Sequence, residues 1–577
     1  MNKDFLSKFF AVAVIVTVLM ATFLRIYRLN EIPSSLYWEE AALGYDAYSI
    51  LHTGKDHHGN PFPVVAFTSF GDFKPSGYFY AIVPFLTIFG LNEWSVRLPS
   101  ALAGVATVIG IGSLVHYLSS RIWPHSSNRF QRFCFLVGLG VATFSPWLIQ
   151  FSRGGWEVNL ATSLLLWSVV LGLWSLKSKK NLLLISSVVL AAASMYVYHA
   201  TRVVAPAVLF GVFLLRSLPY LEQSKFQLKG FFEALKRSLL PGCFFLLLAA
   251  PLLISSRNSS TQQRFAETSI ASDGQYVLDS NHFREVAGNN IFAKALSHRY
   301  IVLGEAVTSA FLSHFSMDFL FISGDKNPRH STGMIGLLAL PDGVWLIVGV
   351  VLLASKSLKQ KSLREVTFFL CWWLCIGILP AALTKAFPHA LRILPTAPVF
   401  LSVVSIGLIQ AILWLKNHFP TKLFAFSLLI ILVVSAGFWM NYWRFYTNIY
   451  PTTSQSDWQY GYKEMVGHLN KEMSEYPESN VFVTREYGRP AMYYWFFSQT
   501  DPRLVQAAET TSPKDQGEFL QYQNISFINT VNEAKAGIVA SSDEGYQQLT
   551  KTFKSVKKLN EVRDLRGNVI WTLSLVE

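Results

Sequence analysis

Charged side chains are scarce in this chain of 577 residues: Asp, Glu, Lys and Arg together make up 15% of it, and hydrophobic residues make up 51%. This composition excludes an ordinary soluble enzyme and predicts a polytopic helical membrane protein. Cysteine is rarer still, because the chain has only four, all within apolar segments. That distribution implies no disulfide framework. Cys371 and Cys375 are four residues apart, but no further metal ligands accompany them.

Glycine-rich phosphate loops are also missing, since no G-x-G-x-x-G sequence follows a predicted strand. The net charge of +13 could suggest a nucleic-acid partner. Most of the Lys and Arg excess, however, lies in short loops between apolar segments, which is typical of membrane topology. We therefore expect a lipid bilayer as the surrounding medium and no nucleic-acid partner.

Long hydrophobic runs are what the sequence has in abundance. About 20 apolar residues cross the hydrocarbon core, and Lys and Arg mark cytoplasmic loops. With the N-terminus inside, these rules predict about eleven transmembrane helices, the first at residues 9–27. That run lacks a small-residue cleavage site, so an uncleaved span is favoured over a signal peptide. Every predicted inner loop is basic, including residues 177–180 and 356–364. The chain is thus predicted to be a multi-pass protein of the cell membrane.

After residue 450 the composition becomes polar and no further span follows. Four short apolar segments are predicted to be buried strands, namely residues 481–484, 525–528, 537–540 and 569–573. Helical patterns lie between them, around 457–473, 490–498 and 543–553. We predict two domains: a transmembrane domain at 1–450 and a small α/β domain at 451–577 on the outer face.

Ionisable side chains gather at the predicted outer ends of the spans. The adjacent carboxylates of Glu39 and Glu40 follow the first span, although ionisable groups at a membrane boundary are costly to desolvate. Cationic groups share their side of the membrane: Lys74, Arg97, Arg153, His199, Arg202, His389 and Arg392. An acidic pair facing several cations indicates a site for an anionic, lipid-linked substrate.

In order, the outer-face motifs are Trp38-Glu-Glu-Ala41, Lys74-Pro-Ser-Gly-Tyr78, Arg97-Leu-Pro-Ser100, Phe151-Ser-Arg153 with Glu157, and Tyr198-His-Ala-Thr-Arg202. This pattern resembles the GT-C membrane glycosyltransferases of family 39, which include protein O-mannosyltransferases and the lipid A aminoarabinose transferase. The resemblance covers roughly residues 10–400. Glu39 stands where that group usually has Asp, which moves the carboxylate by about 1 Å.

The resemblance implies an all-α GT-C membrane domain that transfers a sugar from a polyprenyl-phosphate donor to a protein, lipid or glycan acceptor. It implies that Glu39 is the base, that Glu40 orients the acceptor or a cation, and that Glu157 is the second outer acid. The donor phosphate is expected to meet Lys74, Arg97, Arg202, His389 and Arg392. His389 and Arg392 would share one face of a turn between Pro388 and Pro395.

Structural interpretations remain open for several of these residues. Glu40 could serve as a helix-start carboxylate, and Lys74 could snorkel to the interface. Arg97 could pair with Glu93, four residues earlier, and Glu157 could pair with Arg153.

The sequence assigns no certain cofactor and leaves two rival functions open. No metal ligand is predicted, because the spacing of His314, Asp318, Asp325 and His330 matches no known ligand set, although a divalent cation is left open. The segment Asp56-His57-His58 is expected to be an exposed polar loop. The rival functions are a transporter or flippase of lipid-linked sugars and an inactive scaffold. A transporter would place charges along its spans and contain internal repeats.

Overall fold

The structure is a computed structural model that describes residues 3–70, 72–178, 181–225, 227–255, 268–272, 274–508 and 519–577. The chain divides into two compact units, which we describe separately. The helical unit comprises Met1–Arg25, Ala103–Phe151 and Val158–Tyr442. The mixed unit comprises Ile26–Leu102, Ser152–Glu157 and Trp443–Glu577.

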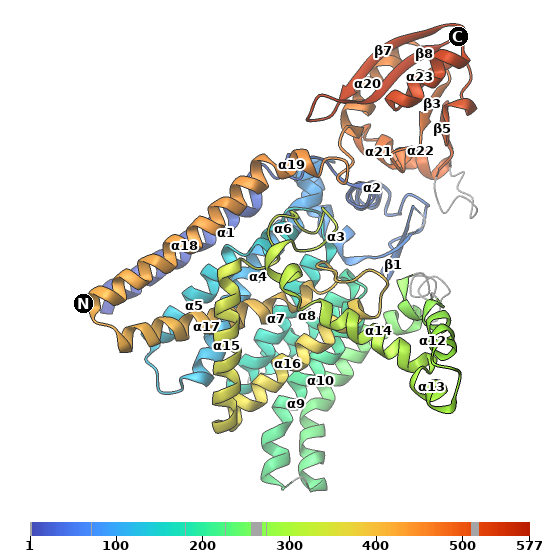
Figure 1. Cartoon of the computed structure of the whole chain (residues 1–577). Helices are drawn as coiled ribbons and strands as arrows, with labels where there is room; N and C mark the ends of the chain where they lie inside the picture. The colour runs from blue at the N-terminus through green and yellow to red at the C-terminus, as the bar shows by residue number, and fades with distance from the viewer. Residues whose placement is uncertain are drawn as a thin grey trace. The chain divides into compact units, whose positions relative to one another are not determined.

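Long apolar helices dominate the helical unit (Figure 1). Among the described residues, nine helices are long and apolar enough to cross a membrane. They are α1 (Lys3–Ile26), α4 (Glu93–Ile122), α7 (Glu157–Ser178), α9 (Thr201–Gln223), α10 (Leu228–Ser255), α15 (Leu340–Lys359), α16 (Lys361–Ala382), α17 (Ala397–His418) and α18 (Thr421–Asn448). The prediction of a polytopic all-α membrane domain is confirmed.

The two remaining predicted spans correspond to less regular helices. Helices α5 (Asn128–Thr143) and α6 (Pro146–Ser152) form a pair bent by 61°. The break falls just before Pro146, which has no N–H to donate and restricts the residue that precedes it. Helix α8 (Asn181–Val197) is apolar but has only 17 residues, so it falls short of the length of an ordinary span.

Large apolar side chains cover the outside of several spans. On α18, Leu432 and Val433 are 67% and 61% exposed, and Ile347 on α15 is 66% exposed. Contiguous apolar surface of this kind is unfavourable in water but matches lipid chains. The exposed faces of these helices therefore indicate the lipid-facing side of the unit.

Shorter elements connect α10 to α15 in the helical unit. They are the 3-10 helix η1 (Ile270–Ser272), α12 (Gln275–Val286), α13 (Ile291–Leu296), α14 (Arg299–Ser313) and the π-helix η2 (Asp318–Ile322). A loop then leads to α15, and a second loop with the 3-10 helix η3 (Leu394–Thr396) joins α16 to α17. These two loops carry the His and Asp residues considered below.

The mixed unit begins with α2 (Trp38–Thr53), the hairpin β1 (Ala66–Ser69) and β2 (Asp72–Pro75), and α3 (Gly77–Phe89). Its C-terminal part is a six-stranded sheet in the order β4-β5-β3-β6-β8-β7, drawn in orange and red in Figure 1. Strand β3 (Val481–Thr484) pairs in parallel with β5 (Ile525–Ile528) and β6 (Gly537–Ser541). Strand β8 (Val569–Val576) pairs antiparallel to β6.

The helices of this α/β part are α19 (Tyr450–Thr453), α20 (Tyr462–Glu475), α21 (Pro490–Phe497), α22 (Pro502–Ala507) and α23 (Asp543–Thr552). All four predicted strands are present, and three of the helices match the predicted segments. Sequence patterns missed β4 (Gln521–Tyr522) and β7 (Val556–Arg563). Strand β7 is an edge strand with the polar sequence VKKLNEVR, which lacks the apolar alternation by which a half-buried strand is recognised.

Candidate functional site

The first turn of α2 separates the two adjacent carboxylates. Successive residues on a helix point about 100° apart, so Glu39 and Glu40 cannot face the same surroundings. Glu40 is fully buried, and its Oε2 accepts a hydrogen bond from the backbone N–H of Tyr37 at 3.2 Å. The Glu39 side chain is 34% exposed. Only Glu39 of the two therefore presents a carboxylate to an incoming molecule.

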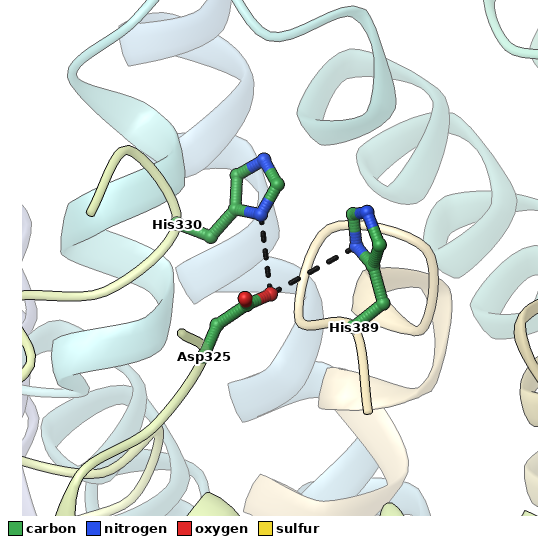
Figure 2. A group of neighbouring side chains, drawn as sticks. All are labelled: Asp325, His330 and His389. Atoms are coloured by element: carbon green, nitrogen blue, oxygen red, sulfur yellow. Dashed lines mark hydrogen bonds and ion pairs between the residues drawn. The ribbon is translucent and has the colours of Figure 1, made fainter. Parts of the chain in front are cut away.

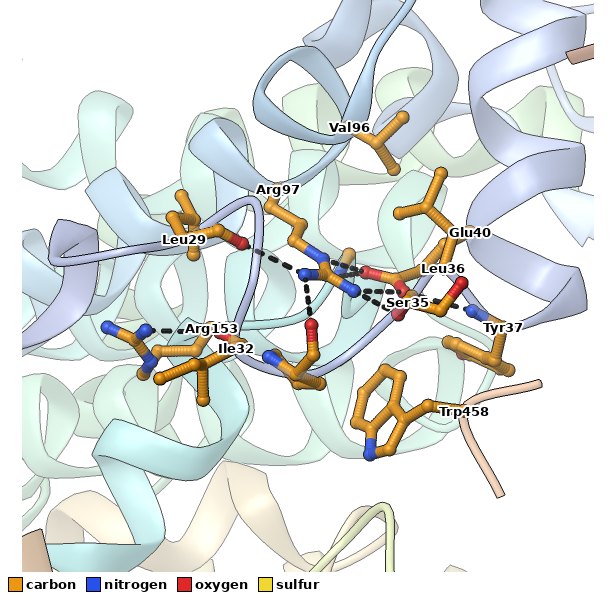
Figure 3. Close-up of polar contacts among 12 residues, drawn as sticks. Leu29, Ile32, Ser35, Leu36, Tyr37, Glu40, Val96, Arg97, Arg153 and Trp458 are labelled. Atoms are coloured by element: carbon orange, nitrogen blue, oxygen red, sulfur yellow. Dashed lines mark hydrogen bonds and ion pairs between the residues drawn. The ribbon is translucent and has the colours of Figure 1, made fainter. Parts of the chain in front are cut away.

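The buried Glu40 carboxylate is held by Arg97 of α4 (Figure 3). Arg97 Nε donates to Glu40 Oε1 at 2.9 Å, and Arg97 Nη2 donates to Oε2 at 3.1 Å. The backbone N–H of Gly155 also donates to Oε1, at 2.7 Å. With the Tyr37 N–H included, four donors saturate the two carboxylate oxygens.

Arg97 uses its remaining N–H groups on backbone carbonyls of the loop before α2. Nη1 donates to Leu29 and Pro33 at 2.9 and 3.0 Å, and Nη2 donates to Ser35. All five guanidinium donors thus have protein acceptors, and the side chain is fully buried. The geometry favours a positioning role for Arg97 and Glu40, rather than the phosphate and acceptor contacts that the resemblance implies.

Lys74 meets the exposed carboxylate. Its Nζ lies 3.4 Å from Glu39 Oε2, and the Tyr37 hydroxyl donates to the same oxygen at 3.1 Å. Lys74 is only 4% exposed, and its Nζ has no hydrogen-bond partner among the described residues. A buried ammonium is costly unless its donors find acceptors. The Glu39–Lys74 pair therefore places a partly exposed carboxylate beside an ammonium that makes no hydrogen bond among the described residues.

The β1–β2 hairpin positions Lys74. In its register Lys74 lies opposite Phe67, and the Phe67 ring stacks on Phe79 of α3 with ring centroids 4.0 Å apart. Both phenylalanines are fully buried. This packing fixes the strand that carries the lysine against the helix that follows it.

Arg153 and Glu157 lie in the short segment Ser152–Glu157, which belongs to the mixed unit. Arg153 is fully buried, and its Nη2 donates to the carbonyls of Tyr27 and Ile32. Glu157 is half-buried at the start of α7. The segment thus braces the same loop that Arg97 holds.

The other sequence-predicted residues belong to the helical unit. Arg202 is half-buried at the second position of α9, and its Nε donates to the carbonyl of Met195 at 3.3 Å. In the loop between α16 and α17, His389 Nδ1 lies 3.8 Å from Asp325 Oδ2. Arg392, from the same loop, donates to the Thr384 hydroxyl.

The expectation of an exposed loop at residues 56–58 is wrong. Asp56 and His57 are fully buried, and His57 Nδ1 lies 2.6 Å from Asp46 Oδ1. Asp46 also accepts a hydrogen bond from the Ser69 hydroxyl at 2.7 Å. Asp46 lies within α2 and Ser69 at the end of β1, so only tertiary contacts reveal that these polar residues join the helix to the hairpin.

A cavity of about 420 Å³ lies in the mixed unit, among aromatic and polar side chains that include Tyr487, Trp571 and Gln459. Gln459 links the cavity to α2, because its Oε1 accepts a hydrogen bond from the backbone N–H of Trp38 at 2.9 Å. Trp38 directly precedes Glu39. Sequence patterns had not singled out these residues, since they carry no motif.

Comparison with known proteins defines the fold. The crystal structure of ArnT from Cupriavidus metallidurans bound to undecaprenyl phosphate is similar, with a TM-score of 0.51, 11% identity and 97% of each chain covered. The apo oligosaccharyltransferase of Archaeoglobus fulgidus has a TM-score of 0.48 and 12% identity, over 85% of this chain and 64% of the other. The chain thus has the GT-C fold of membrane glycosyltransferases, with a small α/β domain after the spans.

Sequence comparisons add nothing to this structural likeness. No protein-family model matches the chain, and no match was found among curated protein sequences. At 11% identity, the likeness to ArnT concerns the fold.

Proposed function

We propose that the protein is an inverting glycosyltransferase that moves a sugar from a polyprenyl phosphate to an acceptor hydroxyl at the outer membrane face. The observation that carries the proposal is the Glu39–Lys74 pair, in which a partly exposed carboxylate adjoins a buried ammonium at 3.4 Å. The shared fold with ArnT, whose crystal structure contains undecaprenyl phosphate, supports the donor class.

In the proposed reaction Glu39 accepts the proton of the acceptor hydroxyl as the oxygen attacks the anomeric carbon. The bond from that carbon to the phosphate oxygen breaks, and the polyprenyl phosphate leaves with the electron pair. Lys74 donates to the phosphate, where negative charge increases as the sugar departs. Its hydrogen-bonding capacity is available for this contact, because the buried Nζ donates to no acceptor among the described residues.

The remaining predicted residues take supporting roles in this proposal. Glu40 and Arg97 hold the loop and the first turn of α2, which keeps Glu39 aimed at the acceptor. Glu157 is the second acid. Donor-phosphate contacts of Arg202 and Arg392 rest on the resemblance alone.

The acceptor is proposed to enter the cavity lined by Tyr487 and Trp571. Aromatic faces with a few polar groups are suited to binding polar organic ligands such as sugars. Tyr487 is 40% exposed, and its ring meets Trp571 edge-on at a centroid distance of 5.0 Å. Gln459 connects this cavity to the residue before the base.

Replacing Tyr487 with Ala tests the acceptor site. The acceptor KM should rise about tenfold, equivalent to about 1.4 kcal/mol, because one aromatic wall is lost. Donor affinity should stay constant, since no donor contact is proposed there. Initial rates at varied acceptor concentration would measure the change, with Tyr476→Ala as a control outside the cavity lining. An unchanged KM would contradict this location for the acceptor.

Replacing Glu39 with Gln tests the reaction itself. The amide keeps the shape of the side chain but cannot accept the proton, so single-turnover sugar transfer should fall by about 10²–10⁴-fold. Binding of undecaprenyl phosphate should survive, because cations hold the phosphate. Glu39→Asp should retain substantial activity, since the related enzymes usually carry Asp at this position.

Two outcomes would redirect the proposal. If Glu39→Gln turns over like the parent while Glu157→Gln is inactive, the base is Glu157. If the parent moves lipid-linked sugars across vesicles but forms no glycosylated product, the transporter alternative holds instead.

A further inference from the structure

Two loops of the helical unit bring an aspartate and two histidines together (Figure 2). Asp325 and His330 come from the loop between η2 and α15, and His389 comes from the loop between α16 and α17. His330 Nδ1 lies 3.1 Å from Asp325 Oδ2, and His389 Nδ1 lies 3.8 Å from the same oxygen. The three ligand atoms all lie within 4.8 Å of one another.

The surroundings orient these groups toward a common point. The backbone N–H of Ala390 donates to Asp325 Oδ2 at 2.7 Å, and the N–H of Asn327 donates to Oδ1 at 2.9 Å. His314 Nδ1 lies 2.7 Å from the carbonyl of Ala310, so its Nε2 can accept the backbone N–H of His389 at 3.2 Å. Such outer contacts are typical of the shell that holds metal ligands in place.

The cluster contains a buried nitrogen, His389 Nδ1, that makes no hydrogen bond among the described residues. Asp325 Oδ2 lies nearby, at 3.8 Å. A buried polar atom without a partner is rare and requires an explanation. A bound cation at the centre of the three ligand atoms would supply that partner.

We propose that Asp325, His330 and His389 bind a divalent transition metal, and the types of ligand favour zinc. Two imidazoles and one carboxylate suit zinc and disfavour magnesium or calcium, which take oxygen ligands. Tetrahedral bonds of about 2.0–2.1 Å place neighbouring ligand atoms about 3.3–3.4 Å apart. The distances of 3.1 and 3.8 Å bracket that separation.

The metal would join the two loops, and one of them carries Arg392. His389 then acts as a ligand and not as a direct phosphate contact. Three protein ligands leave a fourth position for water or an anion. The proposal concerns metal binding and stands whether or not the sugar-transfer reaction is correct.

Metal analysis of the full-length, tag-free protein in detergent tests this site. After growth with zinc and dialysis, inductively coupled plasma mass spectrometry should find about one zinc per chain. Asp325→Asn and His389→Ala should each lose at least about 90% of it. His282→Ala, an exposed histidine on α12, is the matched control and should keep the zinc.

Cobalt provides a second readout that does not depend on activity. Protein stripped with a chelator should bind Co²⁺ with a stoichiometry of one and develop the visible absorption of a tetrahedral nitrogen–oxygen site. Chelation should also lower the Tm of the parent. His389→Gln, which preserves bulk, covers the case in which His389→Ala fails to fold. A parent with less than 0.1 zinc per chain and no saturable cobalt binding would overturn the proposal, as would zinc retained equally by all variants.

Discussion

At the residue scale, two adjacent glutamates lie in different environments, one partly exposed and the other buried. Glu39 and Glu40 are adjacent, yet Glu40 is buried against Arg97 and Glu39 is partly exposed beside Lys74. The cause is the helical rotation between successive residues, combined with an arginine that is already committed to the loop carbonyls. Removing one partner of such a buried pair costs about 3–5 kcal/mol, because it leaves an uncompensated charge. We therefore expect any loss of activity in variants of Glu40 or Arg97 to result from disruption of the loop before α2.

Replacing Lys74 with Met tests whether the ammonium group contributes to donor binding. Methionine keeps an unbranched apolar stem but removes the proposed charge-assisted contact to phosphate, and such a contact is worth about 1.5–3 kcal/mol. Affinity for undecaprenyl phosphate should fall about ten- to a hundredfold, measured by a titration in detergent. Lys535→Met, at an exposed position of the same unit, should leave it unchanged. Equal affinities of the parent and Lys74→Met would remove the lysine from the donor site.

At the scale of elements, the hairpin is the support on which the lysine depends. Lys74 pairs across the strands with Phe67, whose ring stacks on α3, and Ser69 of the same hairpin bonds to Asp46 in α2. An isolated two-stranded hairpin is marginal in water. The contacts with α2 and α3 therefore decide whether Lys74 stays close to Glu39.

Phe67→Ala should weaken donor binding without touching a charged group. Removing a buried phenylalanine costs about 3–5 kcal/mol locally, enough to loosen the hairpin and reduce undecaprenyl phosphate affinity about tenfold. Phe67→Leu should largely preserve binding. Phe482→Ala, in the core of the six-stranded sheet, controls for general destabilisation. This variant should lower the Tm but leave the affinity for undecaprenyl phosphate unchanged. Identical binding losses in Phe67→Ala and Phe482→Ala would argue against a specific role of the hairpin.

At the scale of the whole molecule, the alternation of basic loops with apolar helices predicts the orientation. Cysteines replacing Lys359, the last residue of α15, and Thr550, in α23, test it on a background without the four native cysteines. A membrane-impermeant maleimide applied to intact cells should label the cysteine at position 550 and leave that at 359 unlabelled. Permeabilised cells should label both, which controls for accessibility. The reverse pattern in intact cells would invert the topology.

Some features of the molecule follow from local patterns in the sequence. Apolar runs long enough to cross a bilayer identified the spans, and short β-branched and aromatic runs identified β3, β5, β6 and β8. Both signals lie within a single segment, because each helix or buried strand must be apolar wherever it contacts lipid or core. The polar edge strand β7 was not predicted for the same reason, because hydrogen bonds to β8, and not its own hydrophobicity, define this strand.

The sequence alone therefore determined a polytopic membrane chain, its α/β domain and the group of ionisable residues worth considering. Only the tertiary structure decided that Arg97 meets Glu40 and that Lys74 meets Glu39. It also brings His389 close to Asp325 and His330. The spacing of the candidate residues along the chain matches no known set of metal ligands. The physical reason is that an ionisable side chain is defined by its partners, and these partners come from segments that only folding brings together.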